Sequence, residues 1–206
     1  MKRYFVTGIG TEVGKTVCAA VLVEALQSDY WKPVQSGDLH HTDTDKVRAL
    51  VSNERTAFHP EAYRLTQPLS PHASAARDGI TIDLSAIRPP STSNTLVIEG
   101  AGGLLVPLND HDLLADLIPD FNATVVLVIR HYLGSINHSL LSIHYLRAIG
   151  VEDACILWNG TPNPESEAAI LGHSPYPVLG RIAEAETIDS DYVAREAAKL
   201  RNSLRP

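Results

Sequence analysis

The sequence predicts an α/β protein built on a doubly wound, mostly parallel sheet with helices on both faces. Strand-like and helix-like segments alternate along the 206 residues, several strands are apolar at consecutive positions, and a glycine-rich turn joins the first strand to the first helix. Strands buried on both faces lose polar alternation, so the apolar runs indicate a covered parallel sheet. No linker or repeat interrupts the chain, and we expect a single domain over residues 1–206.

The expected strands are short runs rich in apolar and β-branched residues. They cover residues 2–7, 30–34, 95–99, 124–129, 154–158 and 178–181. The expected helices begin near Thr16, Thr44, Asp112, Ser135, Pro164 and Asp189. Residues 52–94 are rich in Pro, Ser and Thr and too long for a simple connection, so we expect part of this segment to form a wall of a ligand site. Ligands of such sheets bind beyond the carboxyl ends of the strands.

Bulk composition narrows the possible function classes. Hydrophobic residues make up 44% and charged residues 20%, which is typical of a globular domain. A formal net charge of −7 argues against nucleic acid or an anionic membrane as the main partner. No apolar run reaches the roughly 18 residues of a membrane span, and we expect no signal peptide and a cytoplasmic location. The two cysteines, Cys18 and Cys155, lie in apolar segments and are expected to be buried free thiols.

The most informative motif is the loop Gly-Ile-Gly-Thr-Glu-Val-Gly-Lys-Thr, from Gly8 to Thr16, between a predicted strand and a predicted helix. It predicts a P-loop NTPase-like fold, because loop N–H groups and a helix start face a phosphate and Lys15 adds a positive charge. One more residue separates Gly8 from Gly14 than in the standard motif. Glu12 also places a carboxylate in the loop, which requires a nearby cation such as a metal ion or a substrate amine.

Polar residues also follow the second predicted strand. Lys32 interrupts an apolar stretch, as either a snorkelling edge residue or a charge aimed at the site. Ser36 comes next and would bring a hydroxyl to a ligand. Asp43 fits a helix N-cap and Asp45 a first helical turn, and either also fits a magnesium ligand.

The later strands end on polar residues too. Glu99 precedes small residues, Gly100 to Gly103, and with Thr16 and Asp45 would supply the hydroxyl and carboxylate oxygens that Mg²⁺ prefers. Ser135 opens a helix whose free N–H groups could bind a carboxylate. Asn159 is either a turn residue or a group that pairs with an adenine edge.

Together these segments resemble the dethiobiotin synthetase family. The matching segments run in family order through residues 4–8, 11–16, 32–34, 36–37, 70–72, 99–103, 133–134, 136–138 and 159. The loop with its additional residue and its Thr-Glu-Val sequence is the most specific of them. They extend over about three quarters of the chain.

The resemblance implies an ATP- and Mg²⁺-dependent enzyme that closes a ureido ring on 7,8-diaminopelargonate with CO₂, giving dethiobiotin, ADP and phosphate. One amine takes up CO₂ as a carbamate, ATP converts the carbamate to a carbamic–phosphoric anhydride, and the second amine attacks it. The resemblance also implies a homodimer with a shared active site, small molecules as the only substrates, Mg²⁺ as cofactor and ATP as co-substrate.

The resemblance implies roles for individual residues as well. Catalytic roles fall to Lys15, Lys32, Thr11 and Ser36. Metal ligands would be Thr16, Asp45 and Glu99. Substrate contacts would come from Ser36, Lys32 and Glu12, and from Leu133, Gly134 and Asn137 of the partner subunit. Nucleotide and magnesium binding would involve Glu12, Val13, Gly14, Lys15, Thr16, Val17, Asp45, Glu99, Gly100, Ala101, Gly102, Asn159, Gly160, Ile182, Ala183 and Glu184, with Asn159 reading adenine.

The chain departs from the family pattern at three points. The usual loop aspartate is replaced by Gly10 or Ile9, residues 179–184 lack the Ile-Pro-Trp-like pattern near adenine, and Asp43 competes with Asp45 as metal ligand.

Two alternatives belong to other classes. A nucleotide-switch ATPase of the partitioning type would carry a lysine where Gly10 stands, and a small-molecule kinase would need an arginine-bearing lid, for which residues 55–77 offer only Arg55, Arg64 and Arg77.

Overall fold

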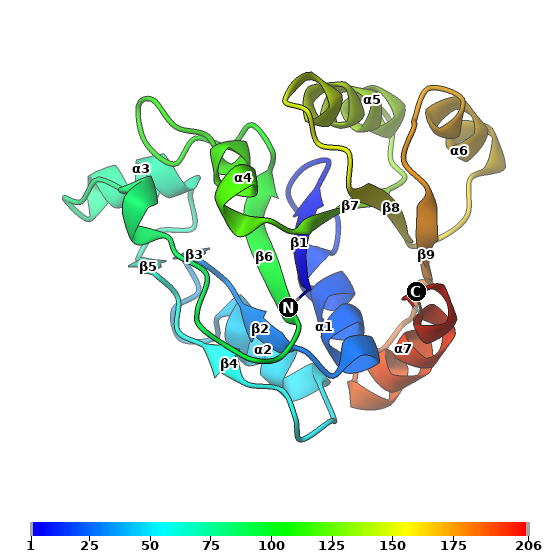
Figure 1. Cartoon of the computed structure of the whole chain (residues 1–206), viewed down its shortest axis with the longest axis horizontal. Helices are drawn as coiled ribbons and strands as arrows, with labels where there is room; N and C mark the ends of the chain where they lie inside the picture. Colours follow the sequence, from blue (N-terminus) through cyan, green and yellow to red (C-terminus); the bar gives the residue numbers. More distant parts are fainter. Residues whose placement is uncertain (1, 205–206) are drawn as a thin grey trace.

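The computed structural model describes residues 2–204 and places seven parallel strands in one sheet, in the order β4-β2-β6-β1-β7-β8-β9 (Figure 1). The strands are β1 (Arg3–Gly8), β2 (Asp29–Trp31), β4 (Phe58–His59), β6 (Leu96–Gly103), β7 (Thr124–Arg130), β8 (Ala154–Asn159) and β9 (Val178–Ile182). A second, two-stranded parallel sheet contains β3 (Val34–Ser36) and β5 (Tyr63–Leu65).

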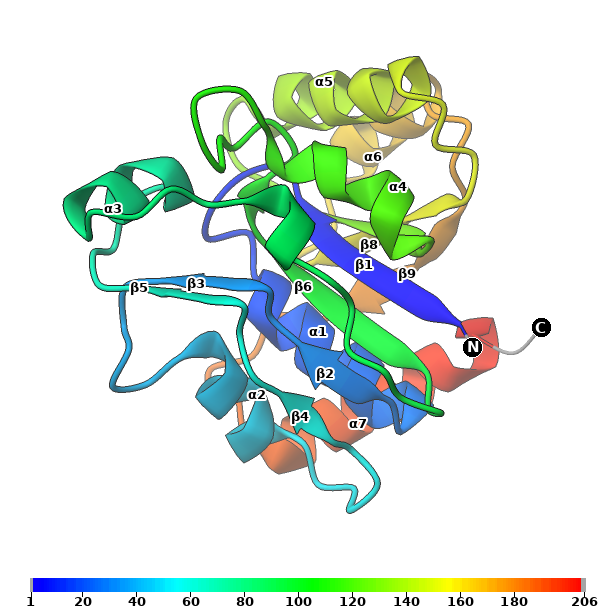
Figure 2. The ribbon, with the colours of Figure 1, turned by 60° about the vertical axis from the view of Figure 1, so that its left-hand side comes forward.

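Helices cover both faces of the main sheet (Figures 1 and 2). One face carries α1 (Lys15–Leu26), α2 (Asp43–Leu50) and α7 (Ser190–Leu204). The other carries η2 (Leu114–Leu117), α4 (Ile118–Phe121), α5 (Ser135–Ala148) and α6 (Pro164–Leu171). Two short elements, α3 (Pro71–Arg77) and η1 (Leu84–Ala86), lie between β5 and β6 along the chain. The predicted doubly wound α/β class is therefore confirmed.

Burial explains the apolar runs in the sequence. Every residue from Val125 to Ile129 in β7 is fully buried, because helices pack on both sides of that strand. Helix α1 is buried on nearly its whole circumference from Cys18 to Ala25, since it lies between the sheet and α7. Cys18 and Cys155 are buried and unpaired, as predicted.

The strand predicted over residues 30–34 is broken in the structure. Strand β2 ends at Trp31, and Pro33 lacks the N–H group that would continue the ladder into β3. The chain then leaves the main sheet and pairs with β5 instead. This break turns Lys32 away from a regular strand position, directly at the carboxyl edge of the sheet.

The helix predicted to begin near Asp112 begins slightly later, at Leu114. Asn109 accepts hydrogen bonds from the backbone N–H groups of His111 and Asp112, at 2.8 Å each, which holds a turn there. Helical structure begins only at Leu114, as a 3₁₀ turn.

Residues 52–94 contain more secondary structure than their composition predicts, namely β4, β5, α3 and η1. These elements are too short to produce a clear hydrophobic period. No helix within residues 2–204 is both long and apolar enough to cross a membrane.

Candidate functional site

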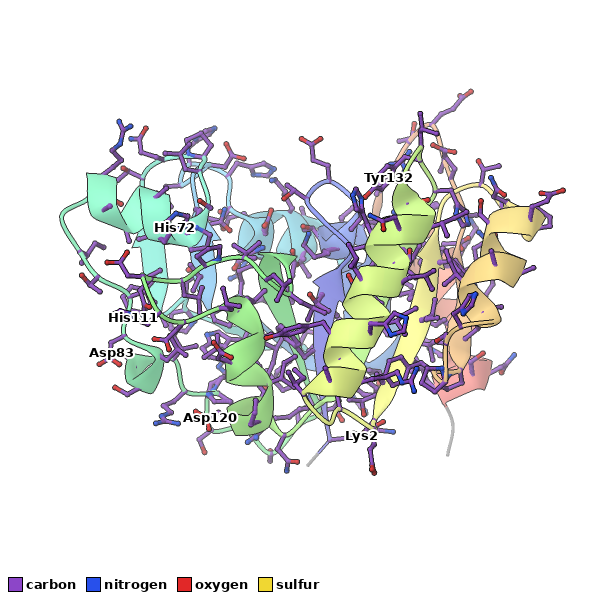
Figure 3. The ribbon with its side chains drawn as sticks, turned by 90° about the horizontal axis from the view of Figure 1, so that it is seen from above. Lys2, His72, Asp83, His111, Asp120 and Tyr132 are labelled. Atoms are coloured by element: carbon purple, nitrogen blue, oxygen red, sulfur yellow. The ribbon has the colours of Figure 1, made fainter. Side chains whose placement is uncertain are left out.

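A cavity of about 650 Å³ opens at the carboxyl edge of the sheet. Figure 3 marks the two edges: Tyr132 follows β7 at the carboxyl edge, whereas Lys2 precedes β1 at the opposite one. The cavity is lined by Thr11, Glu12, Gly14, Lys15, Thr16, Lys32, Val34, Gln35, Ser36, Asp38, Asp43, Lys46, Pro68, Leu69, Ser70, Pro71, Glu99, Ala101, Gly102 and Val106. Residues 68–71 come from the Pro- and Ser-rich segment, which therefore forms part of the wall of this cavity.

The loop before α1 requires glycine at position 14. Gly14 has a φ of 87°, and a Cβ atom there would lie 2.1 Å from Nδ2 of Asn159. The Asn159 side chain in turn donates a hydrogen bond to the carbonyl of Val13 at 2.8 Å. The end of β8 is thus packed directly onto the loop, 146 positions earlier in the chain.

Lys15 is poised at the base of the cavity. Its ammonium group donates to the carbonyl of Gly10 at 2.8 Å, and only 8% of the residue is exposed. Burial lowers the pKa of Lys15 to about 8, against the opposing attraction of Glu99. An anion in the cavity would replace the neutral carbonyl as its partner and favour the charged form.

Thr11 and Glu12 form the exposed rim of the cavity. Glu12 has a φ of 59°, in the left-handed region, which turns this part of the loop outward. Val13 and Val17 do not line the cavity, and Val13 is buried beneath the loop.

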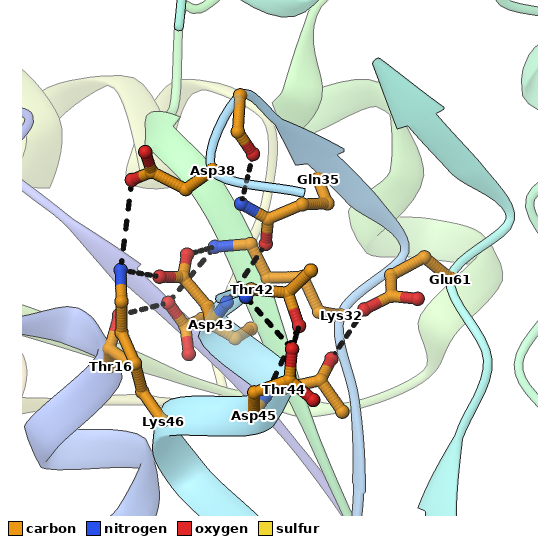
Figure 4. A network of polar contacts seen from close by, with 12 residues as sticks. Thr16, Lys32, Gln35, Asp38, Thr42, Asp43, Thr44, Asp45, Lys46 and Glu61 are labelled. Carbon is orange, nitrogen blue, oxygen red and sulfur yellow. Dashed lines mark hydrogen bonds and ion pairs between the residues drawn. The ribbon is translucent and has the colours of Figure 1, made fainter. Parts of the chain in front are cut away.

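Lys32 joins two acidic residues at the centre of the cavity. Its Nζ atom lies 2.5 Å from Oδ2 of Asp43 (Figure 4). The same atom lies 3.0 Å from Oε1 of Glu99. Burial alone would lower the pKa of Lys32, but the two carboxylates outweigh it and raise the pKa. The same ion pair overcomes burial at Asp43 and lowers the pKa of that carboxyl. Lys32 and Asp43 are therefore both charged at neutral pH.

Glu99 is the most connected group of the site. Its Oε1 atom accepts from the hydroxyl of Thr16 at 2.8 Å, and its Oε2 atom accepts from the hydroxyl of Tyr30 at 2.8 Å. The residue is 1% exposed. The burial of Tyr30 beside this carboxylate raises the pKa of the phenol well above its ordinary value. Glu99 thus holds a fixed orientation beside Thr16, the first residue after the loop lysine.

Asp45 does not join Thr16 and Glu99. Its carboxylate accepts from the backbone N–H and the hydroxyl of Thr42, at 2.9 and 2.8 Å, and completes a capping box at the start of α2 (Figure 4). It is exposed and does not line the cavity. Asp43, two positions earlier, faces the cavity instead. The placement predicted for Asp45 is therefore corrected to Asp43.

The donor set at this point suits a hard cation. Thr16, Asp43 and Glu99 offer a hydroxyl and two carboxylates, the oxygen ligands that Mg²⁺ takes. Within residues 2–204, no three acidic, histidine or cysteine side chains converge on one point. The protein would thus provide part of a coordination shell that phosphate oxygens and waters complete, as is usual for Mg²⁺.

Ser36 lines the cavity from β3, and its hydroxyl is buried without a hydrogen-bond partner. A buried polar atom of this kind requires a ligand or a water, so Ser36 is a natural contact for a bound molecule. Gln35, Asp38 and Lys46 also line the cavity and were missed by sequence reasoning. A signal existed only for Lys46, which lies one helical turn after Asp43 and pairs with it at 3.1 Å.

The last residues of β6 lie in two different environments. Ala101 and Gly102 line the cavity, whereas Gly100 packs against the core, where an added Cβ would lie 3.0 Å from the ring of Phe5.

The residues predicted to surround adenine do lie together. Gly160 donates its backbone N–H to the carbonyl of Ile182 at 2.9 Å, beside Asn159. Ala183 is tied to α7 through Glu196, which accepts its N–H at 3.1 Å, and through Tyr192, whose hydroxyl donates to its carbonyl. Glu184 accepts from Thr161 at 2.7 Å.

Leu133, Gly134 and Asn137 are exposed at the start of α5 and lie outside the cavity of the same chain.

The fold and the loop define a P-loop nucleotide-binding protein of the doubly wound α/β class. Solved structures of the same fold include a plasmid partition protein from Borrelia burgdorferi (TM-score 0.60, 11% identity, covering 98% of this chain and 96% of that chain). The MinD cell division protein of Aquifex aeolicus is also similar (TM-score 0.58, 12% identity, covering 100% and 99%). At these identities the likeness shows the fold alone.

Sequence comparisons place the chain more narrowly. Residues 2–191 match a family described as an AAA domain. The ATP-dependent dethiobiotin synthetase of Christiangramia forsetii is 50% identical over 98% of both chains, and that of Cytophaga hutchinsonii is 50% identical over 97% of both. The chain belongs to the ATP-dependent dethiobiotin synthetase family, a family of ATP-dependent ligases. The family resemblance inferred from the motifs is thereby confirmed.

Proposed function

We propose that this protein closes the ureido ring of dethiobiotin from 7,8-diaminopelargonate, CO₂ and ATP, releasing ADP and phosphate. The observation that carries this proposal is a single cavity in which the phosphate loop, the buried Lys32 and the unpartnered hydroxyl of Ser36 face one another. A nucleotide site alone would not need the second group of polar residues. The relatives named above support the same reaction.

The phosphate end of ATP would lie on the loop. The backbone N–H groups of the loop and of the start of α1 bind the phosphates. The ammonium group of Lys15 then donates to a phosphate oxygen in place of the carbonyl of Gly10. Thr16, Asp43 and Glu99 would hold Mg²⁺, which supplies charge neutralisation to the phosphates when it is bound.

The diamine would bind between the loop and β3. One amine nitrogen bonds to the carbon of CO₂ and loses a proton, which forms a carbamate. A carbamate oxygen then bonds to the γ-phosphorus as the bond to ADP breaks, and the second amine attacks the carbonyl carbon and expels phosphate. Lys32 neutralises the negative charge that collects on the carbamate and the transferred phosphoryl group. Ser36 and Thr11 orient the diamine, and Glu12 attracts its ammonium group.

We further propose that the enzyme acts as a cytoplasmic homodimer of single-domain chains, with active sites shared between subunits. Leu105, Leu133 and Leu141 are 53%, 104% and 58% exposed, and exposed apolar side chains that gather in one patch mark an interaction surface. Leu105 and Leu141 line an apolar groove of about 320 Å³ beside α5. Thr11 lines both this groove and the main cavity, so a second subunit seated in the groove would reach the site.

Ring closure tests the proposal directly. Purified protein with Mg²⁺-ATP and bicarbonate should release ADP only when 7,8-diaminopelargonate is supplied, and mass spectrometry should detect one ureido product per ADP. Rapid ADP release without the diamine would contradict the proposal and favour a nucleotide-switch ATPase.

A further inference from the structure

A second polar cluster lies on the opposite face of β8 from the phosphate loop. It consists of His131, Trp158, Glu167 and Arg181, from four different segments of the chain. Asn159 points toward the loop, and its neighbour Trp158 points to the other side of the sheet, where it is 3% exposed. None of the four residues lines the main cavity.

One carboxylate oxygen holds this cluster together. Oε1 of Glu167 accepts from Nη2 of Arg181 at 2.6 Å and from the backbone N–H of Asn163 at 2.8 Å, and it lies 3.1 Å from Nε2 of His131. The His131 ring stacks on the indole of Trp158, with ring centroids 5.2 Å apart. The guanidinium carbon of Arg181 lies 5.9 Å from the centre of the same indole.

The cluster forms hydrogen bonds to both ends of the β8–α6 loop, residues 160–163. At the first end, Nη1 of Arg181 donates to the carbonyl of Gly160 at 3.1 Å. At the last end, Glu167 accepts the N–H of Asn163. Because the same guanidinium also binds Glu167, one planar group connects the two ends. Arginine has the paired donors that this bridge needs, whereas lysine has a single nitrogen.

We propose that Arg181 and Glu167 are positioning residues that fix the β8–α6 loop and so set the preference of the enzyme for adenine nucleotides. The inference rests on the proposed function and on the role that the family resemblance implies for Asn159, which is to read adenine. Arg181 and Glu167 together form a clamp on this loop. The clamp holds Gly160, which follows Asn159 and donates its backbone N–H to the carbonyl of Ile182 at the end of β9. Neither Arg181 nor Glu167 lines the cavity that Lys32 and Ser36 line, so we expect the pair to act on nucleotide binding and not on ring closure.

The test compares Arg181→Ala and Arg181→Lys with the wild type. Calorimetric titration with Mg²⁺-ATP and with Mg²⁺-GTP should show ATP affinity reduced about tenfold in both variants. The freed loop must then be ordered when ATP binds, at a cost on the order of one charge-assisted hydrogen bond. The affinity for GTP should change little, so the ratio of ATP affinity to GTP affinity should fall. The KM for ATP should rise by the same factor, while kcat at saturating ATP and the KM for the diamine stay within about twofold.

A matched control separates this effect from general destabilisation. Arg88 forms an exposed pair with Asp120 at 2.9 Å and does not line the cavity, so Arg88→Ala should leave both affinities unchanged. Arg181→Lys keeps the charge and should unfold within a few degrees of the wild type. An unchanged ATP-to-GTP ratio in both Arg181 variants, or an equal rise in the KM for the diamine, would overturn the inference. If the wild type binds ATP but closes no ring, the proposed function is wrong. The ATP and GTP titrations of the Arg181 variants would still decide whether Arg181 sets the nucleotide preference.

Discussion

At the scale of single residues, Lys32 carries the strongest prediction. Lys32→Ala should lower kcat on the order of 10²–10³-fold, because it removes a preorganised charge from the transferring phosphoryl group. The affinity for ATP should fall much less, since Lys15 and the loop amides hold the phosphates. Single-turnover kinetics and direct ATP titration measure the two effects separately.

The substitution also leaves Asp43 and Glu99 facing each other without their shared cation, which can cost about 3–5 kcal/mol of folding stability. Thermal unfolding should therefore accompany the kinetics, and Lys32→Arg, which keeps the charge, is the stability control. If the affinity for ATP falls by the same factor as kcat, Lys32 serves binding and has no special catalytic role.

Lys15 predicts a pH dependence of nucleotide binding. Its pKa in the free protein, lowered to about 8 by burial, lies below the ordinary value of 10.5, so above pH 8 the free protein has largely lost this proton. Bound phosphates restore the charged form, and ATP binding at pH 8.5 should take up a proton. ATP affinity should fall as the pH rises through 8. Calorimetry in buffers of different ionisation enthalpy measures the uptake.

Arginine stays charged at every relevant pH. Lys15→Arg should therefore remove the proton uptake, and an unchanged uptake in that variant would assign the proton to another group. The same shift affects stability: between pH 8 and about 10.5 the unfolded chain binds more protons at this position, so Lys15 makes unfolding less favourable as the pH rises.

At the scale of elements, two acidic residues of helix α2 that are separated by one residue have different roles. Asp43 faces the cavity and Lys32, whereas Asp45 closes the capping box with Thr42. Asp43→Asn should raise the Mg²⁺ concentration needed for half-maximal ATP binding by about tenfold or more. The substitution removes a carboxylate that either coordinates Mg²⁺ or positions a residue that coordinates it. Titration of Mg²⁺ at fixed ATP measures this effect.

Asp45→Asn is the matched control for Asp43→Asn. It should leave the Mg²⁺ requirement unchanged and cost about 1 kcal/mol of folding stability, the usual contribution of a helix cap. The opposite pattern, with the metal requirement moved by Asp45 alone, would return the metal site to the residue that sequence reasoning first selected.

At the scale of the whole molecule, the apolar groove beside α5 predicts the oligomeric state. Leu141→Asp places a charge in the groove, where the proposed partner subunit would bury it. The variant should sediment as a monomer and lose ring closure, with little change in its own unfolding temperature because Leu141 is exposed in one chain.

Ile188→Asp is the control for Leu141→Asp. Ile188 is also exposed, at 46%, but it lies between β9 and α7, away from the groove. It should leave sedimentation and activity unchanged. A monomeric wild type that closes the ring would contradict the shared site.

Much of the fold was predictable because its signals are local. The apolar strands and the phosphate loop are encoded by neighbouring residues, and the structure confirms the class they indicate. The errors occur where distant contacts or single side chains decide. Pro33 breaks a strand that composition favours, and the turn that Asn109 holds delays to Leu114 the helix expected near Asp112.

The sequence by itself determined the doubly wound fold, the loop with Lys15 and Thr16, and the family. Only the tertiary structure decided that Asp43 and not Asp45 faces the cavity, that Lys32 bridges it to Glu99 67 positions away, and that Arg181 clamps the loop after Asn159. The physical reason is distance along the chain. A motif records which residues are neighbours in sequence, whereas the charge, burial and partners of a side chain depend on segments that meet only when the sheet assembles.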